Sequence, residues 1–148
     1  MGILFRYNGC MRSFHWTIGK SVFVPELDAE HRNLYELAAE VQASVDAGAP
    51  PPVYTPGVRT LLASAADHFA HEERLMRRAH YPLLKWHTSQ HDAVRTRAAA
   101  CLKLLEAGDA EAGGELLEFL SRWLGDHLAV ADRMMAAALR AHARQRAA

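Results

Sequence analysis

Apolar side chains recur every three or four positions along four stretches of the chain, as on the buried face of an amphipathic α-helix. The stretches cover residues 26–46, 55–81, 84–105 and 116–139, and prolines or glycines lie in the connections between them. No stretch shows the alternating pattern of a half-buried strand. Four such helices with short connections predict an all-α fold, an antiparallel up-down-up-down four-helix bundle.

The connections set the expected boundaries of the bundle. Residues 1–25 form an N-terminal arm, residues 26–142 form the bundle, and residues 143–148 are expected to fray into solvent. The connection AGAPPPVYTPG, residues 47–57, contains four prolines and two glycines. Thr55 followed by Pro56 resembles a helix cap and first turn, so we expect the second helix to begin there.

Composition and charge exclude several classes of protein. The 148 residues carry 17 basic and 17 acidic side chains, so the charge balance predicts no nucleic-acid surface. The two cysteines suggest no disulfide framework, which favours a reducing compartment. No apolar run has the length of a membrane span. We therefore expect a cytoplasmic protein with neither a nucleic-acid partner nor a membrane span.

The chain has nine histidines, and five of them fall on the inward stripes of the predicted helices. Two acids join them, so all four helices contribute to one set: His31, His68, Glu72, His87, His91, His127 and Asp132. A single histidine on an apolar stripe is more often a hydrogen-bonded core residue. Burying seven such groups without a cation would cost several kcal/mol each, comparable with the stability of a whole domain. The set predicts a metal centre.

The types of donor narrow the choice of metal. Imidazole suits zinc, copper, iron or nickel, whereas carboxylates that can bridge favour a pair of hard ions. Seven donors exceed the four that a tetrahedral zinc takes, and none of them is a thiolate. Two ions sharing two bridging carboxylates and an oxygen would use every donor and leave one coordination position open. That count fits two irons.

These residues resemble the hemerythrin family, and specifically the single-domain bacterial hemerythrins. The resemblance covers roughly residues 14–135 and rests on LDAEHRNL around His31, HFAHEERLM from His68, YPLLKWHTSQH with His87 and His91, and WLGDHLAVAD with His127 and Asp132. The sequence FHWTIG is similar to the family's tryptophan-containing arm. Each motif alone is weak, but the ordered set is highly specific.

The resemblance implies which residues hold which iron and what the centre does. One iron would be held by His87, His91 and His127, and the other by His31 and His68. Glu72 and Asp132 would bridge the irons together with an oxo or hydroxo group. Such a site binds O2 reversibly, as a hydroperoxide, at the open iron, and it accepts small anions such as azide there. The partners implied are O2 and a protein that receives it.

The resemblance also implies an apolar O2 pocket beside the open iron, formed by Leu34, Phe69, Trp123 and Leu124. Helical spacing alone would place the same four residues in an ordinary core. Two other functions stay open: a diiron enzyme that reduces O2, peroxide or nitric oxide, and a sensor module for oxygen or iron. Catalytic diiron bundles are rich in carboxylates, whereas this set is rich in histidine. We therefore expect an oxygen carrier, store or delivery protein and not an enzyme.

Overall fold

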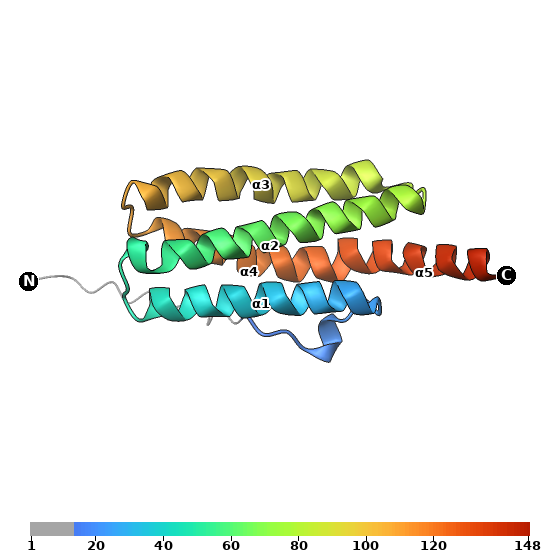
Figure 1. The fold of residues 1–148 in the computed structure, drawn as a ribbon, viewed down its shortest axis with the longest axis horizontal. Helices are drawn as coiled ribbons and strands as arrows, with labels where there is room; N and C mark the ends of the chain where they lie inside the picture. The colour runs from blue at the N-terminus through green and yellow to red at the C-terminus, as the bar shows by residue number, and fades with distance from the viewer. Residues whose placement is uncertain (1–13) are drawn as a thin grey trace, which may run out of the picture.

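A computed structural model describes residues 14–148, and over that range it contains helices and their connections. The elements are η1 (Ile18–Lys20), α1 (Pro25–Asp46), α2 (Pro51–Arg78), α3 (Leu84–Glu106), α4 (Ala112–His127), η2 (Leu128–Asp132) and α5 (Arg133–Ala147). The helices α1, α2 and α3 and the continuous run α4–η2–α5 form four rods. Figure 1 shows these rods packed side by side, with successive rods running in opposite directions. The predicted all-α antiparallel four-helix bundle is confirmed.

The fourth rod consists of three elements that follow one another without a break. The α-helix α4 passes into the π-helical segment η2, which passes directly into α5. A π-helix has i→i+5 hydrogen bonds and therefore contains one more residue per turn than the α-helix that flanks it. An α-helical stripe along residues 116–139 predicts that Val130 and Met134 are buried, but these side chains are 54% and 45% exposed. The extra residue shifts the buried face, so Ala131 and Met135 lie in the core instead.

The second helix begins earlier than expected. We placed its start at Thr55–Pro56, but α2 begins at Pro51. Pro51 and Pro52 occupy the first turn, where a helix needs no backbone N–H donor, so these prolines start the helix and do not interrupt it. Tyr54 lies in this additional turn and is buried against α4, where a Cβ added at Gly113 would lie 2.6 Å from the Tyr54 ring.

The arm packs along the bundle and fixes the start of α1. The Ser21 hydroxyl and the Val22 amide both donate hydrogen bonds to the Asp28 carboxylate in the first turn of α1, at 2.6 and 2.8 Å. Phe14 is buried and meets Tyr35 of α1 edge-to-face. Residues 1–13 of the expected arm lie outside the described residues.

The helix α5 continues through Ala147, and the side chains from residue 143 onwards are exposed. None of the helices among the described residues is both long and apolar enough to cross a membrane.

Candidate metal centre

Every rod of the bundle contributes at least one polar side chain to the middle of the core. All seven residues predicted as metal ligands are at most 5% exposed: His31 of α1, His68 and Glu72 of α2, His87 and His91 of α3, His127 of α4 and Asp132 of η2. The pairs His68/Glu72 and His87/His91 are each four residues apart, so both members of a pair point from the same helix face.

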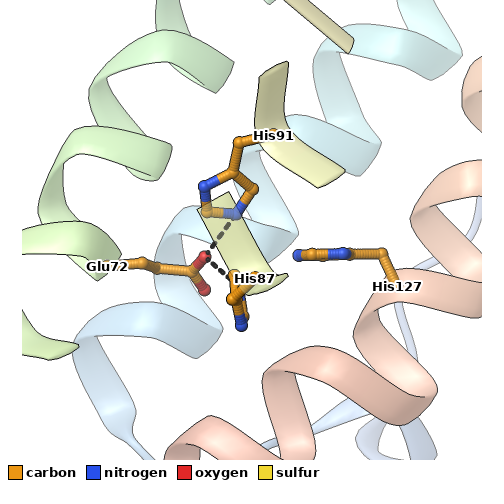
Figure 2. A group of neighbouring side chains, drawn as sticks. All are labelled: Glu72, His87, His91 and His127. Carbon is orange, nitrogen blue, oxygen red and sulfur yellow. Dashed lines mark hydrogen bonds and ion pairs between the residues drawn. The ribbon is translucent and has the colours of Figure 1, made fainter. Parts of the chain in front are cut away.

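Glu72 lies between two groups of histidines. Its Oε1 is 3.2 Å from Nε2 of His68 and 3.7 Å from Nε2 of His31. Its Oε2 is 3.1 Å from Nε2 of His91 and 3.3 Å from Nε2 of His87. Figure 2 shows Glu72 pointing from α2 toward His87 and His91, with His127 entering from the far side. Each carboxylate oxygen therefore faces a different group of histidines.

The two carboxylate oxygens of Asp132 also face different groups of histidines. Its Oδ2 is 3.2 Å from Nε2 of His31, while its Oδ1 is 2.9 Å from Nε2 of His127 and 3.2 Å from Nε2 of His87. The seven residues thus form two overlapping clusters, each with ligand atoms within 4.8 Å of one another. One contains Glu72, His87, His91 and His127, and the other contains His31, His68, Glu72 and Asp132.

The π-helical segment η2 is what places Asp132 in this arrangement. In a regular α-helix, with 3.6 residues per turn, a residue five positions after His127 would point about 140° away from it. The wider turn of η2 reduces this angle, and the Asp132 and His127 side chains meet at 2.9 Å. Single π-helical turns inside α-helices occur frequently at functional sites.

In three of the five histidines, the ring nitrogen Nδ1, which points away from the centre, contacts a polar side chain. Nδ1 of His68 lies 2.7 Å from Glu30, Nδ1 of His91 lies 3.0 Å from Glu73, and Nδ1 of His127 lies 2.8 Å from the side-chain oxygen of Gln90. In the neutral tautomer that carries its proton on Nδ1, each ring would donate this N–H to its acceptor, and Nε2 would be free to bind a metal at the centre. Such outer partners orient metal-binding histidines and increase their basicity.

The charges of the site keep both buried carboxylates ionised. Burial raises the pKa of Glu72, but the charge of His68 and hydrogen bonds from the surrounding histidines outweigh it and hold the pKa well below its usual value. Burial and the charge of Glu72 raise the pKa of Asp132, but its close contacts with His127, His31 and His87 outweigh both and lower the pKa. Two carboxylate anions buried in the same cluster require nearby positive charge, from protons or from a cation.

The surroundings raise the pKa of two of these histidines and lower the pKa of a third. Burial lowers the pKa of His68, but Glu72 and Glu30 outweigh it and raise the pKa to about 10. The pKa of His87 rises to about 9, because hydrogen bonds to Asp132 and Glu72 outweigh burial. The pKa of His127 is lowered, since burial dominates there.

The donor set fits a metal. Five buried ligand atoms lie within ion-pair distance of a neighbouring ligand but make no hydrogen bond of suitable geometry among the described residues: Nε2 of His31, His91 and His127, Oε1 of Glu72 and Oδ1 of Asp132. Buried polar atoms without partners are rare in proteins, and all five face the two clusters. Imidazole nitrogens and ionised carboxylates are suitable ligands for divalent metals of the first transition row.

A small apolar cavity lies beside the clusters. Its volume is about 10 Å³, close to the minimum for one water molecule, and every residue that lines it is apolar. The four residues expected in an O2 pocket, Leu34, Phe69, Trp123 and Leu124, all line it. Phe69 stacks on His91 with ring centroids 4.1 Å apart, and Trp123 stacks on His127 at 4.2 Å. The cavity wall therefore also supports two of the histidines.

Comparison with known proteins identifies the family. Residues 22–139 match the family model described as Hemerythrin HHE cation binding domain. The chain belongs to the hemerythrin family. A bacteriohemerythrin of Stenotrophomonas maltophilia is 29% identical over 133 residues, which cover 88% of this chain and 84% of that protein. Hemerythrin-type metal binding is the general property that this membership and the buried cluster support together.

Two further relatives show the same likeness over shorter alignments. A bacteriohemerythrin of Ralstonia nicotianae is 34% identical over 74 residues, covering 50% of this chain and 54% of that protein. A bacteriohemerythrin of Pseudomonas aeruginosa is 26% identical over 113 residues, covering 76% of this chain and 72% of that protein. No solved structure matches the chain.

Relative to the sequence analysis, the structure brings together all seven predicted ligands and the four pocket residues. Sequence reasoning missed Glu30, Glu73 and Gln90, which hold the histidines from behind. A signal was present, because each of them is a polar residue next in sequence to a predicted ligand. α-Helical spacing would place His71 at the surface, away from His68 and Glu72, but His71 is partly buried and shares Glu30 with His68 through a 2.7 Å contact.

Proposed function

We propose that this hemerythrin-family chain is a non-heme diiron protein that binds O2 reversibly and serves as an oxygen carrier, store or delivery protein, and not as an enzyme. The observation that carries the proposal is the orientation of the Glu72 and Asp132 carboxylates. Each carboxylate presents one oxygen to each group of histidines. Two carboxylates in this position suit a pair of metal ions that they bridge. A single ion would leave one oxygen of each carboxylate without a partner.

In this proposal His87, His91 and His127 hold one iron, and His31 and His68 hold the other. Glu72 and Asp132 bridge the irons, together with an oxo or hydroxo group. Three histidines and the three bridges would saturate the first iron, whereas the second, with two histidines, would keep one position open. O2 and small anions such as azide would bind at that position. A pair of ferrous ions would supply the two electrons that O2 accepts on binding.

The residues of this chain would favour binding over further reaction in two ways. The apolar cavity lined by Leu34, Phe69, Trp123 and Leu124 would admit O2 and exclude water and stray protons. The Glu30, Glu73 and Gln90 side chains would keep three ligand rings in one orientation through each cycle of binding and release. The matched relatives from three bacteria are each named bacteriohemerythrin, which agrees with the same reading.

Metal analysis of the purified protein and of a bridging variant tests the proposal. Protein expressed in iron-rich medium should contain two irons per chain, and azide should change the visible spectrum of its oxidised form. Glu72→Gln should lose most of its iron, because the amide cannot neutralise two cations, and we expect its metal affinity to fall at least about 100-fold. Asp67→Asn, an exposed change on the same helix, should keep both irons.

Several results would contradict the proposal. One zinc per chain, or no metal after expression in iron-rich medium, would exclude a diiron centre. Full iron content in the Glu72→Gln variant would show that Glu72 does not bridge. An absent spectral response to azide would show that neither iron has an open position.

A further inference from the structure

A groove of about 440 Å³ lies at the end of the bundle where α2 finishes and α5 ends, and we call it the end groove. It is lined by residues 23–26, by Leu75 and Arg78 of α2 and the following Ala79, and by α5 residues between 139 and 146. Figure 1 shows that the last turns of α5 extend past the α2–α3 connection at this end. The end groove contains none of the seven residues assigned to the metal centre.

The side chains that line the end groove are largely apolar, and one lining residue, Phe23, has a strained backbone conformation. Val24, Leu75 and Leu139 pack against the edge of the core and line the groove. Phe23 has a φ angle of 60°, in the left-handed region that bulky residues rarely adopt, and its side chain is 71% exposed. Strained residues of this kind cluster at ligand-binding sites and persist only when the surrounding structure enforces them.

The surroundings do enforce the position of Phe23. The guanidinium of Arg140 donates a hydrogen bond to the carbonyl oxygen of Val22, the residue before Phe23. The same guanidinium lies 6.0 Å from the centroid of the Phe23 ring. Arg140 therefore fixes the exposed aromatic ring as one side of the end groove.

The rim of the end groove is positively charged. Three arginines line it, Arg78, Arg140 and Arg146, against the single carboxylate of Glu26. Arg78 and Arg146 make no ion pair or hydrogen bond with any residue that the structure describes. Nε2 of His142, a further lining residue, is buried and also lacks a hydrogen-bond partner in the described part of the chain. An apolar groove with unpaired guanidinium groups on its rim is complementary to an anion that carries an apolar chain.

We propose that the end groove binds a free single-chain carboxylate amphiphile of the fatty-acid class. Its alkyl chain would lie against Leu75 and Leu139, and its carboxylate would pair with Arg78 and Arg146. The volume falls in the range of small-molecule sites, roughly 300–1,000 Å³. Twelve residues line the groove, fewer than the roughly 20–30 that each side of a stable protein interface contributes. The size therefore favours a small ligand over a docked protein.

Calorimetric titration of the metal-loaded full-length protein with dodecanoate, below its micellar concentration, tests the proposal. We expect saturable binding of one dodecanoate per chain. Dodecyltrimethylammonium, which has the same chain and the opposite charge, should bind at least 10-fold more weakly. Heat that grows without saturation, or equal affinity for the two amphiphiles, would overturn the proposal.

Matched variants locate the site. The double change Arg78→Ala and Arg146→Ala should weaken dodecanoate binding at least 10-fold, and Ala143→Trp should block it by filling the groove. The control pair Arg77→Ala and Arg144→Ala removes two exposed arginines from the same helices outside the groove and should leave binding unchanged. Equal losses in the two double variants, with helix content and metal content intact, would contradict the proposal. Binding to phosphatidylglycerol vesicles but not to free dodecanoate would also contradict it.

Discussion

Leu124 lies one helical turn before His127 and lines the apolar cavity beside the metal clusters. If the cavity protects bound O2 from water, a polar side chain at this position should speed the loss of oxygenated protein. We expect Leu124→Ser to keep both irons and to bind O2, but to autoxidise several-fold faster than the parent. The measurement is the decay of the oxygenated visible spectrum at fixed pH and temperature.

A loss of packing alone must be separated from the entry of water. Leu117→Ser is the matched control, because Leu117 is fully buried on the same helix and does not line the cavity. Each serine variant should lose about 2–5 kcal/mol of folding stability, as large-to-small changes in cores do. Equal autoxidation rates in the two variants would show that Leu124 is an ordinary core residue.

The ionisable side chains of the site make the stability of the metal-free chain depend on pH. The pKa values of His68 and His87 are raised to about 10 and 9, so the stability gained from protonating them is complete below the ordinary value of 6.5. It is lost as the pH rises through 9 and 10. The pKa of Glu72 is lowered, so its contribution is complete above the ordinary value of 4.5 and is lost as the pH falls. His127, with its lowered pKa, opposes His68 and His87 near pH 6.5.

We therefore expect the free energy of unfolding of the chelator-treated chain to fall between pH 7 and pH 10. Urea denaturation at pH 7.0, 8.5 and 10.0 measures this change. His68→Gln should flatten the profile, because it removes the group with the higher of the two raised pKa values. Metal affinity should change in the opposite direction, since binding requires unprotonated imidazole. A metal-free chain that gains stability up to pH 10 would contradict the assigned charges.

The metal-ligand residues were the part of the site that could be predicted most directly from the sequence. His68, Glu72, His87 and His91 could be predicted because helical spacing places them on inward faces among apolar residues. Glu30 could not be assigned in the same way. It lies beside His31 in the sequence but accepts its hydrogen bond from His68 of another helix, and helix-to-helix pairing is not visible in the pattern of one helix.

At the scale of the element, two glycines of α4 have opposite surroundings. A Cβ at Gly113 would lie 2.6 Å from the buried Tyr54 ring, whereas a Cβ at Gly125 would meet nothing within 4 Å. Gly113→Ala should therefore destabilise the protein by about 1–3 kcal/mol through overpacking. Gly125→Ala should stabilise it by up to about 1 kcal/mol through helix propensity. Chemical denaturation of both variants measures the difference, and the prediction fails if Gly113→Ala is the more stable of the two.

The helices themselves were predictable, but two of their details were not. Prolines usually signal a connection, but Pro51 and Pro52 are tolerated in the first turn of α2, and Tyr54 in that turn is buried against Gly113. The π-helical segment η2 could not be predicted for a different reason. A stripe with the period of an α-helix assigns Val130 and Met134 to the core, whereas one extra residue in the turn exposes both and directs Asp132 inward.

At the scale of the whole molecule, the arm links the start of α1 to the last helix. Arg133 donates a hydrogen bond to the carbonyl of Gly19, and Arg140 donates one to the carbonyl of Val22. These contacts join residues more than 100 positions apart, and the second of them places Arg140 along one side of the end groove. The arm was expected from sequence, but these partners were not, because no periodic pattern connects residues so distant in the chain.

The bundle as a whole surrounds one buried set of donors, and the central claim is that this set binds O2 reversibly through two irons. The most direct measurement is the visible spectrum of the reduced, iron-loaded protein, recorded without oxygen, after exposure to air and again after removal of O2 under vacuum. We predict a new absorption band in air that disappears under vacuum and returns over several cycles. A spectrum that does not change in air, or one that changes once and never reverts, would contradict reversible O2 binding.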